Sequence, residues 1–323
     1  MWSRFAVAIM LVGIGLPPPS RAQQITSDVV IPGATLNDGY MAWICDSEGQ
    51  LYRRPTGRGA SIMRVAKDGS TLLFTLPEPE TSIGVFAPAR TGLTVLNSHY
   101  SRAEGVSYKM YRFDVQGTLV AQYDVSLDFQ PLAMAVISSG KTIVVGYRPR
   151  VDTDQEARTY VGALLDVEGQ LQIQFDFPPS PDGLKWTPVN FPRMAGGDAA
   201  AHLIFQTGAE PSFAIARITE SGKVDFMPLK TVRGAGFHDW FFGNGVAAEN
   251  FQFSVEKPPG ATHWDVYDLS SGTRISTKTL LPAGFSIGCY LGDEVSVLAH
   301  SAQVEKSRGL PPEALRLVTV KLE

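Results

Sequence analysis

A strand–turn–strand unit recurs about every fifty residues along this chain. Its clearest copy spans residues 107–125, where alternating side chains run into an Asp-Val-Gln-Gly turn and a second strand returns. Glycine suits a turn position with positive φ, and an aspartate three residues earlier can cap the turn amides. A period of this length with this content is typical of β-propellers, in which each repeat forms one blade. The turn glycines of the series are Gly69, Gly117, Gly169, Gly222 and Gly272.

A second series of hairpins alternates with the first. Its flanking segments are more apolar, as in residues 133–147 around Gly140 and 289–300 around Gly292. Two hairpins per period give four antiparallel strands per blade. We expect the apolar hairpin to form the inner strands a and b, and the alternating hairpin to form the outer strands c and d, with one face partly wet.

The two ends of the chain each carry one strand without a partner in its own hairpin. Residues 315–323 form a last strand with no returning strand, and residues 27–32 resemble the outer strands of the repeats. Pairing these two segments would close the ring and remove its open edge. The sequence therefore predicts an all-β fold: a six-bladed β-propeller of four-stranded antiparallel blades, closed by the N-terminal strand on the C-terminal strand.

Residues 1–22 have the pattern of a secretory signal peptide. Arg4 precedes an apolar run over residues 5–16, and the segment ends in Ser-Arg-Ala, which resembles a cleavage site at Ala22. The run is shorter than the roughly 20 residues that span a bilayer. We expect an exported protein, periplasmic or secreted, with residues 23–323 as a single propeller domain. An uncleaved membrane anchor is the alternative.

The charge of the chain is weakly acidic, with 28 Lys and Arg against 32 Asp and Glu. Removal of the leader would take two of the basic residues, Arg4 and Arg21. A net acidic surface argues against nucleic acid as the main partner. We expect a monomer with no transmembrane segment and with a protein, peptide or glycan partner.

The two cysteines precede turn glycines of inner hairpins in the first and sixth predicted blades. These blades are neighbours in a closed ring, so Cys45 and Cys289 could form a disulfide in an exported protein. Two buried free thiols are the alternative, because cysteine is often an ordinary core residue. The sequence leaves both alternatives open.

One face of the predicted disc is built from long polar connections, and the other from tight hairpin turns. The b–c and d–a connections emerge on the same face, which we call the loop face. The b–c loops of the first three blades are rich in arginine, whose forked guanidinium suits carboxylate or phosphate groups. Solvated loop charge is the plainer alternative. The candidate ligand-binding residues, with two aromatic anchors, are Arg53, Arg54, Arg102, Arg148, Arg150, Tyr100 and Trp186.

Polar residues stand where several predicted a strands begin, near the central channel. Asp38, Asn190, His238 and Asp239 offer oxygen and nitrogen ligands for a divalent cation there. Ordinary turn capping by Asn and Asp is the alternative. The chain contains no nucleophile-elbow, zincin, P-loop or dinucleotide motif.

The D-x-x-G hairpins at residues 114–117 and 166–169, with six blades and a signal peptide, resemble secreted bacterial six-bladed propellers of the TolB-like or NHL-like type. This resemblance implies a binding or scaffolding role, so we expect a non-enzymatic protein without a cofactor, which binds its ligand on the loop face. Some relatives in this group are calcium-dependent lactonases or gluconolactonases. The alternative is therefore a calcium-type hydrolase at the channel mouth, with Asp38, Asn190 and Asp239 as ligands.

Overall fold

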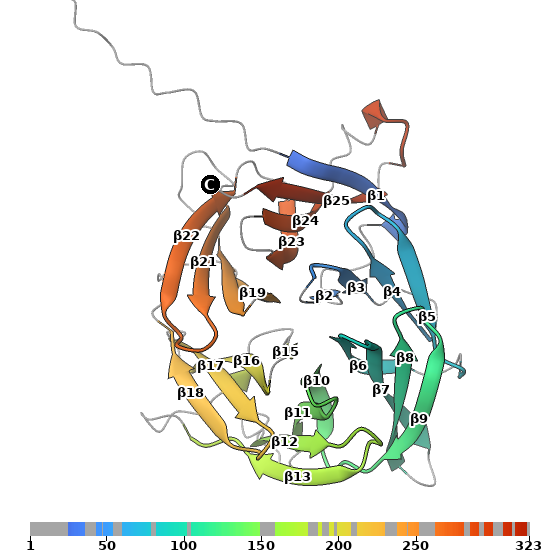
Figure 1. The fold of residues 1–323 in the computed structure, drawn as a ribbon, viewed down its shortest axis with the longest axis vertical. Coiled ribbons are helices and arrows are strands. Elements are labelled where there is room, and N and C mark those ends of the chain that lie inside the picture. Colours follow the sequence, from blue (N-terminus) through green and yellow to red (C-terminus); the bar gives the residue numbers. More distant parts are fainter. Residues whose placement is uncertain are drawn as a thin grey trace, which may run out of the picture.

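The computed structural model describes residues 25–321, with gaps at 36–42, 47, 54–59, 79–81, 102–104, 149–158, 180–186, 189–193, 197–198, 208–211, 230–237, 244, 252–261, 281–284, 291–293, 300–305 and 312–313. The described strands form six antiparallel sheets, which stand around a common axis in a β-propeller (Figure 1). In the first five sheets, the strands that come first in the chain lie nearest the axis, and in the last sheet β23 lies nearest the axis with β1 at the rim (Figure 1). No described helix is long and apolar enough to cross a membrane.

The first three sheets each follow the chain order from the axis outwards. The first contains β2 (Trp43–Cys45), β3 (Leu51–Arg53), β4 (Ser61–Val65) and β5 (Thr71–Thr75). The second contains β6 (Ser82–Ala89), β7 (Gly92–Ser101), β8 (Gly105–Asp114) and β9 (Leu119–Val125). The third contains β10 (Gln130–Val136), β11 (Thr142–Arg148), β12 (Thr159–Leu165) and β13 (Leu171–Asp176).

The fourth sheet differs at its inner edge, and the last two return to four strands. The fourth contains β14 (Thr187–Pro188), β15 (Met194–Ala195), β16 (Ala200–Thr207), β17 (Ser212–Thr219) and β18 (Val224–Pro228). The fifth contains β19 (His238–Gly243), β20 (Val246–Phe251), β21 (Thr262–Asp268) and β22 (Arg274–Leu280). The last contains β23 (Phe285–Tyr290), β24 (Glu294–Ala299), β25 (Ala314–Lys321) and β1 (Ile25–Thr35).

Two short strands share the inner edge of the fourth sheet. Both β14 and β15 pair with β16, so this sheet has five strands where the others have four. Pro188 ends β14, and proline has no N–H to donate to a strand ladder, which restricts it to a sheet edge. The predicted architecture of four-stranded antiparallel blades is confirmed, with this one divided strand.

The ring closes at its rim through β1. This strand pairs antiparallel with β25, with Val29 opposite Leu317 and Val30 opposite Arg316. Ile31 is only 1% exposed and packs in a core cluster with Leu51 of the first sheet. The predicted pairing of the N-terminal strand with the C-terminal strand is therefore confirmed, and β1 also contributes to the core.

A disulfide closes the ring a second time, nearer the axis. Cys45 of β2 and Cys289 of β23 are bonded, with their Cα atoms 5.6 Å apart. The disulfide alternative is thus confirmed, and the alternative of two free thiols is wrong. The disulfide joins the first and last sheets at their inner strands. At the rim, β1 completes the last sheet by pairing with β25 and packs Ile31 in one cluster with Leu51 of the first sheet.

The outer hairpin turns have the predicted chemistry. Gly117 has a φ of 83°, and Oδ1 of Asp114 accepts hydrogen bonds from the backbone N–H groups of Gln116 and Thr118, at 2.9 Å each. The same arrangement recurs at Asp166. A substitution that requires negative φ would strain these turns, which is why a glycine recurs in each repeat.

The core lies between neighbouring blades. Tyr108 and Met110 of β8 pack towards the third sheet, while Tyr111 and Phe113 pack in a cluster with the first. The expectation of one wet face for the outer hairpin is therefore wrong for β8, because blades cover it on both sides. The same expectation fits β9 better, because β9 carries exposed side chains such as Val120.

Candidate functional site

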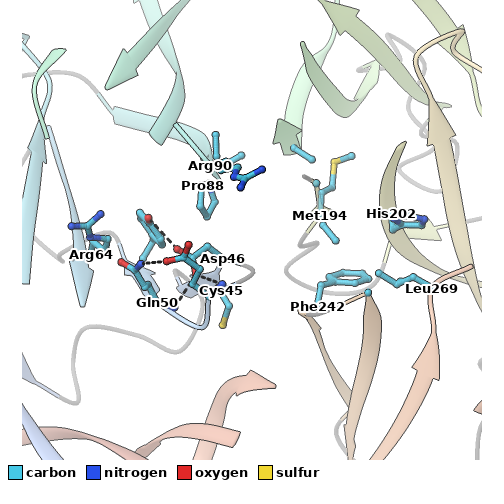
Figure 2. Close-up of a pocket in the computed structure, with 18 of the residues that line it drawn as sticks. Cys45, Asp46, Gln50, Arg64, Pro88, Arg90, Met194, His202, Phe242 and Leu269 are labelled. Atoms are coloured by element: carbon cyan, nitrogen blue, oxygen red, sulfur yellow. Dashed lines mark hydrogen bonds between the residues drawn. The ribbon is translucent and has the colours of Figure 1, made fainter. Parts of the chain in front are cut away.

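A cavity of about 530 Å³ lies on the propeller axis, and we call it the axial cavity. Residues from the first five sheets line it (Figure 2). Many of them belong to the hairpin turns between strands a and b, such as Glu48, Arg90 and Gly245, and Val115 and Leu269 come from outer turns. The cavity therefore lies at the turn end of the axis, opposite the loop face.

One wall of the cavity is polar and is built on the turn between β2 and β3. Oδ1 of Asp46 accepts hydrogen bonds from the backbone N–H groups of Glu48 and Gln50, at 2.9 Å each. The side-chain amide of Gln50 donates to Oε2 of Glu48 at 3.0 Å. A carboxylate therefore caps this turn, as in the outer hairpins, but this turn lies at the axis.

Two further lining side chains are connected to this polar wall. The hydroxyl of Tyr52 donates to Oδ2 of Asp46 at 3.3 Å, and Tyr52 is only 2% exposed. Arg64 lies opposite Tyr52 in the strand register, interacts with its hydroxyl, and has its guanidinium carbon 6.0 Å from the centre of the Phe74 ring. The wall is therefore a connected network of side chains.

Burial determines the electrostatics of this network. It raises the pKa of the Asp46 carboxyl above its ordinary value, although the backbone N–H groups of Gln50 and Glu48 favour the charged form. Burial also raises the pKa of the Tyr52 hydroxyl, with the nearby Asp46 carboxylate adding to the shift. The hydroxyl is accordingly neutral at physiological pH and can act as a donor.

The opposite wall is apolar and comes from the fourth and fifth sheets. Met194, Phe242 and Leu269 are between 6% and 8% exposed and gather on this side in Figure 2. His202 of β16 lies near them and is also buried. The axial cavity thus presents polar groups on one side and a hydrocarbon and aromatic surface on the other.

Arg90 is the exposed charged residue of the turn between β6 and β7. Its side chain extends from beside Pro88 towards the middle of the cavity (Figure 2). No hydrogen bond or ion pair joins Arg90 to another of the residues that the structure describes. It is therefore a positive charge available at the cavity.

The predicted loop-face residues are only partly described. Tyr100, near the end of β7, is 77% exposed. Arg148 ends β11 and forms ion pairs with Asp128 at 3.1 Å and with Asp176 at 3.6 Å. Four other predicted residues lie outside the described part of the chain: Arg54, Arg102, Arg150 and Trp186.

The placement of Arg53 in a loop is wrong. Arg53 is the last residue of β3 and is 2% exposed. Its side chain is covered by the surrounding structure, and the guanidinium nitrogens Nε and Nη1 are buried with it. Arg53 therefore belongs to the interior of the first sheet, and its side chain is not on an exposed binding surface.

The predicted cation ligands fall mainly outside the described residues. Asp38 and Asn190 lie in gaps, and the side chains of His238 and Asp239 are not described, although both residues stand at the start of β19 as predicted. Among the residues that the structure does describe, no three His, Cys, Asp or Glu side chains group as metal ligands. The cation site stays a prediction.

Comparisons with known proteins show no relationship at the sequence level. No protein-family model matches the chain, and no curated protein matches it. The structure is similar to that of a streptogramin B lyase, with a TM-score of 0.44, 12% identity, and 91% of this chain and 97% of the other covered. It is also similar to a protein of unknown function from Bacteroides caccae, with a TM-score of 0.42, 11% identity, and 86% and 94% covered. These likenesses concern the fold alone.

Proposed function

We propose that this protein is a non-enzymatic binding protein that holds a small ligand in the axial cavity. The observation that carries the proposal is the cavity itself, with a polar wall around Asp46 facing an apolar wall around Phe242. Its volume of about 530 Å³ lies within the range of roughly 300–1,000 Å³ that small-molecule sites occupy. Apolar surface with a few placed polar groups is the usual composition of such sites.

The hydrogen bonds of the polar wall favour binding over acid–base catalysis. A general base needs free access to the proton that it removes. Oδ1 of Asp46 accepts from two backbone N–H groups, and its Oδ2 accepts from Tyr52. These bonds hold the turn in place, so the carboxylate serves as a fixed part of the wall.

We also propose that the fourth sheet counts as a full blade with a divided inner strand, which makes the ring six-bladed.

We further propose that the protein is exported and is a monomer. The disulfide between Cys45 and Cys289 supports export, because structural disulfides persist in oxidising compartments. The likeness to TolB-like or NHL-like propellers remains one of architecture.

A fluorescence titration tests the binding proposal. The probe is N-phenyl-1-naphthylamine, a neutral aromatic molecule whose emission rises in apolar surroundings. We expect saturable one-to-one binding to the purified protein. Gln50→Trp should abolish it, because Gln50 lines the cavity through its side chain while its backbone N–H would still cap the turn. No saturable binding, or unchanged binding to Gln50→Trp, would contradict the proposal.

A second location, on the loop face, is supported by the exposure of Tyr100. An aromatic ring that is 77% exposed beside the b–c connection of the second sheet offers a contact surface. Arg148, at the same end of the third sheet, has 39% of its side chain exposed and is shared between two carboxylates. This site would take a larger anionic partner, such as a peptide or glycan.

A further inference from the structure

We propose that the ligand of the axial cavity is an amphipathic anion, whose negative group pairs with Arg90 and whose apolar body lies against Met194, Phe242 and Leu269. This inference rests on the proposed function, since it names the class of ligand for the same cavity. It follows from three observations: the partners of the charged side chains, the chemistry of the apolar wall, and the position of Arg90 between the walls.

The charged side chains of the cavity differ in whether they already have partners. Asp46 is held by Tyr52 and by backbone N–H groups, and Glu48 by the amide of Gln50. Arg64 interacts with the Tyr52 hydroxyl and faces the Phe74 ring. Among the described residues, Arg90 has no such partner. Of the two guanidinium groups that line the cavity, that of Arg90 is therefore the one available to pair with an entering anion.

Guanidinium chemistry indicates the kind of group that fits Arg90. Its planar fork matches carboxylate, sulfonate or phosphate oxygens with two parallel hydrogen bonds. Because Arg90 is exposed at the cavity, this pair would be partly screened by solvent and would contribute modestly. The anionic group therefore orients the ligand, and most of the binding energy must come from elsewhere.

The apolar wall supplies that energy. Met194 is flexible and polarisable and adapts to irregular ligands, and Phe242 offers a ring for aromatic contact. Removing apolar surface from water stabilises a complex by about 25 cal/mol per Å². A ligand with only a charged group would leave this wall hydrated, and a purely apolar one would leave Arg90 without a partner.

Two probes with one aromatic skeleton separate these contributions. 1-Anilinonaphthalene-8-sulfonate carries a sulfonate, and N-phenyl-1-naphthylamine is the same skeleton without it. We expect both to bind the full chain, and Arg90→Gln to weaken binding of the sulfonate probe about fivefold while the neutral probe changes little. Arg90→Lys should retain most of the sulfonate affinity because it keeps the charge.

The matched control is Lys67→Gln, which removes the same charge from an exposed outer turn of the first sheet away from the cavity. It should change neither affinity. Unchanged sulfonate binding in Arg90→Gln, or an equal loss for both probes, overturns the anion assignment while cavity binding stands. An equal effect of Lys67→Gln also overturns it, since the effect would then be one of net charge. Failure of both probes to bind the wild-type protein contradicts the proposed function as well.

Discussion

The hydroxyl of Tyr52 donates a hydrogen bond to Oδ2 of Asp46, at 3.3 Å, and thereby joins β3 to the turn that precedes it. Asp46 also caps this turn, as Asp268 caps an outer turn of the fifth sheet. The two carboxyls differ in pKa direction. Burial raises the pKa of Asp46, whereas hydrogen bonds from the hydroxyls of Ser270 and Ser271 lower the pKa of Asp268.

This difference predicts an unusual pH dependence for Asp46. Its pKa is 3.8 in the unfolded chain and higher in the folded protein, so the folded state binds more protons between the two values. The free energy of unfolding therefore falls as pH rises through that window and is level above it. Asp46→Asn keeps the cap but has no carboxyl to titrate at this position. Its free energy of unfolding relative to that of the wild type, measured in urea titrations, should therefore rise over the same pH window.

Asp268→Asn is the control, with the opposite sign. The folded pKa of Asp268 is depressed, so its contribution is present above pH 3.8 and is lost as pH falls through the folded value. The variant should be less stable than wild type at neutral pH, and the gap should close in acid. If both variants change with pH in the same direction, the burial argument for Asp46 is wrong.

The double closure of the ring predicts a large effect of the disulfide. Cys45 and Cys289 are 244 residues apart, so the bond restricts the unfolded chain strongly. Replacing both with alanine should lower the free energy of unfolding by about 2–4 kcal/mol, measured by denaturant unfolding without reductant. Free-thiol titration of the denatured, unreduced wild-type protein should detect no thiol.

The rim closure is tested in the same assay. Ile31→Ala should cost about 2–5 kcal/mol because Ile31 is buried in the cluster between the first and last sheets. Ile25→Ala is the matched control, since Ile25 lies in the same strand and is 53% exposed, and it should change stability by less than about 0.5 kcal/mol. Equal costs for the two variants would contradict the packing of β1 into the core.

Much of the architecture could be predicted because its signals are local. A turn such as that at Gly117 needs positive φ and a nearby cap, so glycine and aspartate recur wherever the hairpin recurs. Closure of the ring could be predicted because the strand at each end of the chain lacks a partner in its own hairpin. Arg53 was misplaced because a charged residue before a polar loop reads as part of it, although β3 extends to include it.

The axial cavity could not be predicted, because its walls come from separate repeats. Met194 and Phe242 each read as ordinary core residues of inner strands, and only the radius of the ring leaves space between them and Asp46. Arg90 offered the one local signal. Arg90 lies in the tight inner turn between Ala89 and Gly92. Because this turn is too short to carry the residue away from the axis, a charged side chain here must lie near the axis.

The loop-face hypothesis predicts a salt-sensitive interaction with polyanions. On a dextran sulfate resin, Tyr100→Ala and Arg148→Glu should each elute at lower salt than wild type, because one removes a contact ring and the other reverses a charge. Lys223→Glu, an equivalent reversal in an exposed turn of the fourth sheet, should have little effect. If only Lys223→Glu shifts elution, the loop face is the wrong surface.

The calcium-type hydrolase makes a different prediction from the binding protein. A cation that binds only the folded state raises the thermal unfolding midpoint by mass action. As a binding protein without a cofactor, the chain should unfold at the same temperature with added calcium and with chelator. A rise in calcium that disappears in Asp239→Asn would favour the hydrolase and the predicted site at the start of β19.

The most direct test of the central claim is a crystal structure of the protein grown with 1-anilinonaphthalene-8-sulfonate. We predict density for one probe in the axial cavity, with the sulfonate at the Arg90 guanidinium and the rings against Phe242 and Met194. Probe density confined to the loop face or to the outer strands, with the axial cavity filled only by water, would contradict the account.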